Sequence, residues 1–476
     1  MPSHEEGLDP DNWQSFAKAV HDLLDECIHR LQCVEDYPWR PVPEDIHQRY
    51  LIGESPLDMN ELVAALKTDV MPYATGNTHP RFFGWVHGTG LATGLLTEMA
   101  SAAMNSNCGG RDHGMTYMER EVIDWTKSAM GFPAGASGVL VAGTSQATVI
   151  ALAAARVRAL GPEVRVSGQA GQWLTAYTGP GTHSAIRKAV ELLGIGSENL
   201  RIIPENERGM DPHLLRKEIA RDRAAGAMPF AIIATAGSVD LGKFDDLKEL
   251  ASVAAEEDVW LHVDGAFGAW TRLAEEPWRG LSDGIELADS LACDFHKWMF
   301  VQYDCGLVLI RDEHEHRQAF SMRPSYLTSY DQGLAGGEPW YCDYGIDLSR
   351  GNRALKVWAA LRSYGPQKLG QAITRCCQLA QYMAELIAED GAMQLQAPVV
   401  SSLCVFTADG RLGGAEQSEM NVAIAQRLQI EGAAVFSTTN INNVTYLRAA
   451  ITNHRTRRAD VARALHAVVA ARDRQL

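Results

Sequence analysis

Two ionisable side chains of opposite charge stand out between residues 259 and 310. Asp264 ends the apolar run VWLHVD, and Lys297 lies further along in DFHKWMF, directly after His296. A lysine amine can form a Schiff base with an aldehyde, and a carboxylate can keep a ring nitrogen protonated. A lone aspartate after a strand is more often a turn residue, and a lone lysine is more often solvated. The pair therefore needs support from the rest of the chain.

The amine and the carboxylate together suit pyridoxal phosphate (PLP), whose protonated ring draws electrons from the substrate α-carbon. The cofactor also needs an anion site, and residues 138–156 read GVLVAGTSQATVIALAAAR. This pattern predicts a strand, a turn at Gly143 and a helix whose first amides, with the hydroxyls of Thr144 and Ser145, can bind a phosphate. An ordinary strand-to-helix turn with a Thr or Ser cap is the alternative. The segment lacks the Lys-Ser/Thr ending of a Walker loop.

Two segments carry a family resemblance. DSLACDFHKWMFVQYDCG resembles the lysine segment of the group II PLP-dependent amino-acid decarboxylases, and HVDGAFGAW resembles the aspartate strand of that family. The resemblance runs in the family's order from about His79 to Arg455. It implies the PLP-dependent transferase-like fold (fold type I), an α/β architecture with a mostly parallel central sheet, an N-terminal helical segment and a smaller α+β C-terminal domain.

The resemblance also implies an activity. The expected reaction converts an L-amino acid with an aromatic or other bulky side chain to its amine and CO2, through a Schiff base at Lys297. Three other PLP reactions stay open: an aldehyde synthase, a decarboxylase of an acidic or polar amino acid, and another carbon–carbon lyase. A non-catalytic homologue that serves as a scaffold is the alternative outside enzymology, and the joint presence of Lys297, Asp264 and His183 argues against it.

Residue roles follow from the resemblance. His183 is expected to stack on the cofactor ring near the substrate carboxylate, and Tyr341 to return a proton to the α-carbon, with Tyr344 as the alternative. The expected catalytic residues are Lys297, His183, Tyr341 and Asp264. The expected cofactor-binding residues are Gly143, Thr144, Ser145, His183, Ser238, Asp264, Ala266, His296 and Lys297.

The expected substrate pocket draws on two stretches. Trp85 and His87 belong to HPRFFGWVHGTG, which leads into one wall of the pocket in the family, although an aromatic cluster is equally often ordinary core. Asn107 and Ser349 are the other two candidates. The loop NSNCGGRD, residues 105–112, is polar where aromatic-specific relatives are apolar, so the sequence does not fix the substrate.

Two polar groups need separate interpretation. Asp294 stands where relatives often have an asparagine that contacts phosphate, and an ionised carboxylate there would repel the phosphate. Either Asp294 turns away from the phosphate, or a cation offsets it, with His296, Arg350 or Arg353 as candidates. The run RDEHEHRQ, residues 311–318, places two histidines two positions apart. We interpret that run as a charged surface segment and expect no metal site.

Alternating apolar strands and helices through residues 138–310 predict an α/β domain whose ligands lie at the carboxyl ends of the strands. We expect three units: residues 1–90 as an N-terminal helical dimer-packing segment, 91–355 as a large PLP-binding domain and 356–476 as a small α+β domain. Asp9 and Pro10 predict the start of the first helix.

The composition sets limits on partners and location. A net charge of −16 without a long basic block argues against nucleic-acid binding. The acidic N-terminus, the absence of a long apolar run and nine scattered cysteines without a CxxC pair predict a cytoplasmic protein that is not bound to a membrane. The resemblance implies a homodimer with its active site at the subunit interface.

Overall fold

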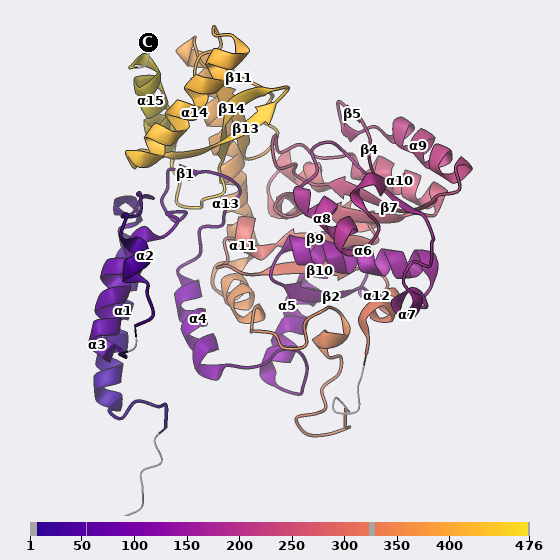
Figure 1. Cartoon of the computed structure of the whole chain (residues 1–476), viewed down its shortest axis with the longest axis horizontal. Coiled ribbons are helices and arrows are strands. Elements are labelled where there is room, and N and C mark those ends of the chain that lie inside the picture. Colours follow the sequence, from indigo (N-terminus) through magenta and orange to yellow (C-terminus); the bar gives the residue numbers. More distant parts are fainter. Residues whose placement is uncertain (1–6, 54, 323–328, 475–476) are drawn as a thin grey trace, which may run out of the picture.

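A seven-stranded sheet forms the centre of the large domain in this computed structural model, which describes residues 7–53, 55–322 and 329–474 (Figure 1). The strand order is β2-β10-β9-β8-β7-β3-β4. The strands are β2 (Ser137–Val141), β3 (Leu174–Thr178), β4 (Leu200–Ile202), β7 (Met228–Thr235), β8 (Trp260–Asp264), β9 (Ser290–Asp294) and β10 (Gly306–Ile310). All neighbours are parallel except β10, which runs antiparallel to both β2 and β9. The expected α/β fold with a mostly parallel sheet is confirmed.

Helices cover this sheet and connect its parallel strands. They are α5 (Gly114–Met130), α6 (Thr144–Leu160), α7 (Val164–Ser167), α8 (Ser184–Leu192), α9 (Pro212–Ala224), α10 (Leu247–Glu257), α11 (Phe295–Trp298) and α12 (Glu313–Phe320). Strands β8, β9 and β10 are buried along their whole length because helices cover them, so their sequences are nearly continuous apolar runs. Helix α6 contacts β7, β8, β9 and β10, and its alanine-rich sequence permits that close approach.

A second sheet of five strands, in the order β1-β13-β14-β12-β11, belongs to the C-terminal region. Its strands are β1 (Phe82–Phe83), β11 (Gln394–Leu395), β12 (Leu403–Thr407), β13 (Val435–Ile441) and β14 (Val444–Ala450). The helices beside it are α13 (Ala354–Asp390), α14 (Gly414–Ile430) and α15 (Arg458–Asp473). Helix α13 bends at Gly365, which has a φ of 74° and is followed in the chain by Pro366. Strand β1 comes from the N-terminal part of the chain and pairs with β13 in parallel.

The N-terminal helices form a column beside the body of the molecule (Figure 1). They are α1 (Trp13–Gln32), α2 (Ile46–Arg49) and α3 (Met59–Ala65), and α4 (Thr93–Met104) follows β1. The predicted start at Asp9 is wrong, because Asn12 caps α1: its Oδ1 accepts hydrogen bonds from the amides of Gln14 and Ser15, each at 3.0 Å. Trp13, with 60% of its surface exposed, leaves part of the apolar face of α1 uncovered.

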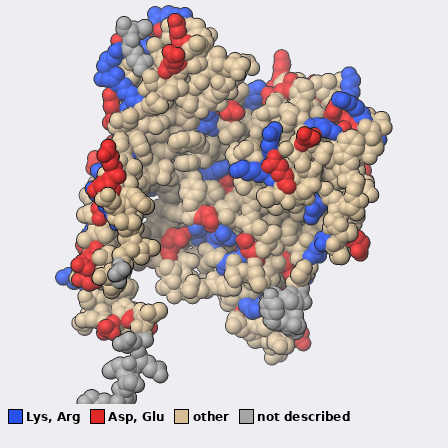
Figure 2. Space-filling view, viewed as in Figure 1, with Lys and Arg blue, Asp and Glu red and all other residues tan. Residues whose placement is uncertain are grey.

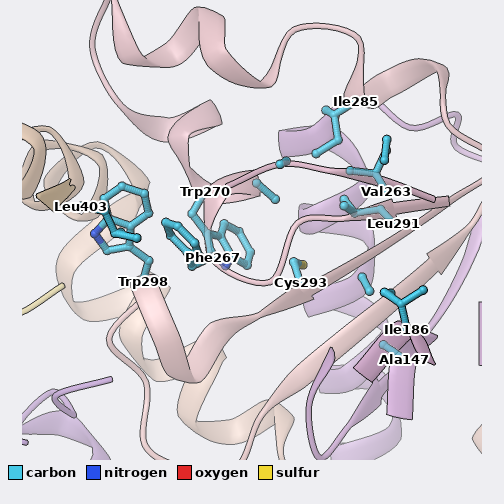
Figure 3. Packing of buried hydrophobic residues seen from close by; sticks show 14 of the residues in the cluster. Ala147, Ile186, Val263, Phe267, Trp270, Ile285, Leu291, Cys293, Trp298 and Leu403 are labelled. Carbon is cyan, nitrogen blue, oxygen red and sulfur yellow. The ribbon is translucent and has the colours of Figure 1, made fainter. Parts of the chain in front are cut away.

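An aromatic cluster lies beneath the carboxyl ends of β8 and β9 (Figure 3). The rings of Phe267 and Trp298 are 5.5 Å apart, and those of Trp270 and Phe295 are 4.9 Å apart. The Trp270 indole also donates a hydrogen bond to the backbone oxygen of Asp294 at 2.9 Å. These contacts fix the turn that carries Lys297, because Phe295 and Trp298, which flank it in the sequence, are anchored in the core.

The surface carries charges of both signs. Figure 2 shows lysine and arginine side chains interspersed with aspartate and glutamate over one face of the molecule. Within the described residues, no helix is both long enough and apolar enough to cross a membrane.

Candidate active site

A cavity of about 430 Å³ lies at the carboxyl ends of β7, β8 and β9 and the start of α6. Ten of the predicted site residues line it: Trp85, His87, Gly143, Thr144, Ser145, His183, Asp264, Ala266, His296 and Lys297. They come together because the strands that precede them are parallel neighbours in one sheet. A wider surface hollow of about 890 Å³, which includes Arg165 and Arg317, contains none of the predicted site residues.

Asp264 and Lys297 face the same cavity, one at the end of β8 and the other just after the end of the adjacent strand β9. Asp264 is the last residue of β8, is 5% exposed and accepts the Ala266 amide at 3.1 Å. Burial raises the pKa of Asp264, and the nearby Lys297 partly offsets that effect. A cationic ring nitrogen placed against this carboxylate would favour its charged form. Lys297 lies on α11, immediately after β9, and its Nζ is 3.1 Å from Asp294 Oδ2.

The start of α6 offers groups for an anion. The amide of Thr144 donates to Asp294 Oδ1 at 2.7 Å, and the amides of Gln146 and Ala147 donate to the Gly143 carbonyl. The Thr144 Oγ1 atom is buried and has no hydrogen-bond partner in the part of the chain that the structure describes. A buried hydroxyl of this kind requires a partner. A phosphate bound between Thr144 and Ser145 would supply it, so the residues present fit PLP.

Two histidines are oriented by local bonds. His183 caps α8, and its Nδ1 accepts the Ala185 amide at 3.1 Å, so the outer edge of the ring remains available to the cavity. His296 Nδ1 accepts the Cys305 amide at 3.1 Å, which assigns the proton of the neutral ring to Nε2. Burial lowers the pKa of His296 and favours this neutral form.

Three predicted site residues lie outside this cavity. Ser238 lies between Gly237 and Val239, which line it, and its Oγ accepts the Lys243 amide at 3.0 Å. Asn107 and Ser349 line a separate hollow of about 240 Å³, together with Arg111. In one chain, the expected substrate pocket is therefore divided between two places.

The two candidate proton donors also lie elsewhere. Tyr341 is 3% exposed, and its ring centroid is 5.4 Å from the Arg350 guanidinium. The Tyr344 hydroxyl donates to the Glu313 carboxylate. Both tyrosines face a third hollow of about 310 Å³ rather than the cavity with Lys297. The glycine-rich sequence of residues 325–349 also predicts a loop there, and residues 325–328 of that stretch lie outside the described residues.

The sequence interpretation missed Arg448 and Tyr303, which both line the cavity. Arg448 extends from β14 and donates to Ser437 Oγ at 3.2 Å; burial lowers the pKa of Arg448 to about 10, so it stays cationic at neutral pH. The Tyr303 hydroxyl accepts the Gly88 amide at 3.1 Å, and its ring is 4.4 Å from that of His296. The proximity of Tyr303 to Lys297 in the sequence was a usable signal. Arg448 had none, because only the packing of the small sheet brings it to the cavity.

Two charge interpretations need revision. Arg350 is not a partner of Asp294, because it is buried in an ion pair with Glu119, Nη2 to Oε1 at 2.6 Å. Arg353 instead contacts Asp304 at 2.8 Å. The cation that meets Asp294 is Lys297 itself, with His296 Nε2 at 3.7 Å from its Oδ2.

The surface interpretation of residues 311–318 is wrong for His316, which is fully buried in α12. Its ring nitrogens contact Ser137 Oγ at 2.8 Å and the Tyr344 carbonyl at 2.7 Å. Among the residues with described placement, no group of three or more His, Cys, Asp or Glu side chains could hold a metal ion.

The sheet order, the aspartate at the end of β8, the lysine after β9 and the anion site at α6 define a PLP-dependent enzyme of fold type I. The pyridoxal-dependent decarboxylase conserved domain matches residues 45–409, and the chain belongs to this family. It is a PLP-dependent carboxy-lyase.

Relatives cover nearly the whole chain. An aromatic-L-amino-acid decarboxylase of Bacillus atrophaeus is 30% identical over 92% of this chain and 88% of its own length. A 4-hydroxyphenylacetaldehyde synthase of Rhodiola rosea is 28% identical over 91% of this chain and 90% of its own. The crystal structure of Catharanthus roseus tryptophan decarboxylase in complex with L-tryptophan superposes with a TM-score of 0.87 at 26% identity, covering 98% of this chain and 100% of that one.

Proposed function

We propose that this carboxy-lyase acts on an aromatic L-amino acid and releases the amine and CO2. The observation that carries the proposal is the single cavity that joins Lys297, Asp264 and the α6 anion site to the aromatic pair Trp85 and His87. The relatives named for aromatic substrates support the same substrate class. PLP, when bound, supplies the electron sink that makes loss of CO2 possible.

The chain's own residues divide the remaining work. Lys297 would hold the cofactor covalently, and Asp264 would keep its ring nitrogen protonated. Arg448 contributes a buried cation, and each of its three guanidinium nitrogens already donates to a protein oxygen. The hydrogens left on its two Nη atoms can bind the substrate carboxylate. His183 offers a flat ring and a nitrogen on the cavity side.

An aromatic wall supports a ring-bearing substrate. The rings of Trp85 and His87 are stacked with centroids 5.5 Å apart, and His87 also stacks on Phe82 at 5.7 Å. Trp85 leaves 51% of its surface exposed although it lines the cavity. A substrate ring placed there would cover apolar surface that is otherwise in contact with water.

We also propose a homodimer in the cytoplasm. The hollow with Asn107, Arg111 and Ser349 would complete the cavity of the partner subunit, and the exposed apolar face of α1 would pack on that subunit. The three units at residues 1–90, 91–355 and 356–476 are part of this proposal.

The proton donor is a phenol in this proposal, and two residues compete for the role. Tyr341 is favoured by its position in the family pattern, whereas Tyr303 is favoured by its place in the cavity with Lys297. Burial raises the pKa of Tyr303, which keeps its hydroxyl protonated at neutral pH.

The test is a panel of L-amino acids given to the PLP-loaded protein, with CO2, amine, aldehyde, ammonia and peroxide measured together. Equal amounts of CO2 and amine from an aromatic substrate support the proposal. Aldehyde with ammonia and peroxide would assign an aldehyde synthase instead. Turnover of an acidic or polar amino acid, with aromatic ones inert, would overturn the substrate class.

A further inference from the structure

A buried carboxylate occupies part of the phosphate-binding end of α6. Asp294 is 2% exposed, and its Oδ1 accepts the amide of Thr144, the first residue of the helix, at 2.7 Å. The same oxygen is within 3.5 Å of the position that a Cβ on Gly143 would take. Asp294 therefore lies against the anion site itself.

The electrostatics of this arrangement oppose a phosphate. The first amides of a helix stabilise negative charge, and here one of them already binds the Asp294 carboxylate. A phosphate held by the neighbouring Ser145 and by the unpaired Thr144 hydroxyl would meet a like charge in a buried site, where screening by water is weak.

The ion pair between Lys297 and Asp294 also withholds a cation from the phosphate. Lys297 Nζ is 3.1 Å from Asp294 Oδ2 in the present arrangement. While Asp294 holds it, this ammonium is not free to pair with a phosphate. His296 Nε2, at 3.7 Å, is the remaining polar neighbour, and burial favours its neutral form by lowering its pKa.

We propose that Asp294 is a positioning residue that weakens phosphate recognition, so that this chain discriminates less between phosphorylated and unphosphorylated forms of its cofactor than its α6 site would otherwise allow. The carboxylate holds Lys297 in place and occupies the Thr144 amide, and both actions oppose tight binding of the phosphate. The proposal concerns the cofactor and not the substrate, so its failure would leave the proposed function intact.

The experiment compares two ligands that lack the aldehyde and therefore do not react with Lys297. Cofactor-free protein is titrated with pyridoxamine 5′-phosphate and with pyridoxamine, and tryptophan fluorescence reports the two dissociation constants. The dissociation constant of pyridoxamine divided by that of pyridoxamine 5′-phosphate measures what the phosphate contributes to binding. We expect Asp294→Asn to raise this ratio by about 10- to 100-fold, because the repulsion is removed while the amide oxygen can still accept the Thr144 hydrogen bond.

The matched control is Asp222→Asn, which changes a buried aspartate that is bound to Arg201 and Tyr177 and does not line the cavity. Its ratio should equal that of the unchanged protein. If Asp294 acts only by ordering Lys297 or the local fold, both ligands change equally and the ratio stays within about twofold, which overturns the proposal. A lower ratio in Asp294→Asn would show that the carboxylate assists the phosphate and would overturn it as well. Asp294→Ser, which also removes the charge, repeats the test if the asparagine variant does not fold.

Discussion

The cavity around Lys297 and the hollow around Ser349 are built in different ways. The cavity lies where parallel strands of one sheet end, and the backbone register of β8 with β7 and β9 fixes the place of Asp264. The hollow is formed by residues 107–111 and 342–349, which lie outside the strands. The first contains groups that can carry a reaction, and the second contains polar groups without a nucleophilic amine.

This difference indicates which part of the site one chain completes. The cavity brings an amine, a carboxylate and an anion site together within a single subunit. The hollow takes part in catalysis only if it lies next to the cavity of a second subunit in a dimer. The following changes test that division, beginning with the largest expected effect.

Replacing Lys297 with alanine should abolish turnover, with a loss of at least about 1,000-fold, because the group that holds the cofactor covalently is gone. The protein should stay folded, since the Lys297 side chain is not enclosed in the core and retains 23% exposure. Release of CO2 from the preferred substrate measures the effect. Lys248→Ala is the control, because that lysine forms a surface pair with Asp283. Substantial residual activity would show that Lys297 is not the residue that binds the cofactor covalently.

Filling the hollow should inactivate the partner's site in the proposed dimer. We expect Ser349→Trp to reduce activity by about 100-fold, because the bulk would enter a pocket that needs precise fit. Coexpressed Ser349→Trp and Lys297→Ala chains should recover about a quarter of the activity, since half of the dimers are mixed and each mixed dimer has one intact site. If coexpression restores no activity, both regions belong to the active site of the same subunit.

Local patterns predicted the large sheet well. The apolar runs before Gly143, Asp264 and Lys297 became β2, β8 and β9, and the order of these strands brought the expected residues to one cavity. Short-range patterns suffice there because buried parallel strands read as continuous apolar runs. Strand β3, which precedes His183, is buried along its length in the same way, and His183 caps the helix that follows it.

Long-range packing explains what the patterns missed. Strand β1 pairs with β13 although more than half of the chain separates them, and Arg448 reaches the cavity only through that small sheet. His316 is part of a charged run, yet two hydrogen bonds make its burial possible. Such contacts depend on partners that local sequence does not identify.

Removing one phenol at a time compares the two regions as sources of the proton. If Tyr303 is the donor, Tyr303→Phe should lower amine formation by about 10- to 100-fold and raise the share of aldehyde and peroxide, while Tyr341→Phe has a smaller effect. The reverse order would assign the donor to Tyr341, which directly precedes the segment that lines the hollow. Measuring all three products separates a lost proton donor from general damage, because general damage lowers every product together.

His316 ties residue 344, in the segment that leads to the hollow, to the large sheet and should make that contact sensitive to acid. Its ring joins Ser137 of β2 to the Tyr344 carbonyl, and burial lowers the pKa of His316 to about 4. The unfolded chain binds this proton near pH 6.5, before the folded protein does, so the stabilisation is present above pH 6.5 and is lost as the pH falls toward 4. The loss is at most about 3 kcal/mol for this histidine. Thermal unfolding at about pH 7.5 and about pH 5 should show a smaller shift for His316→Gln than for the unchanged protein, and an equal shift would assign the acid sensitivity to the other buried histidines.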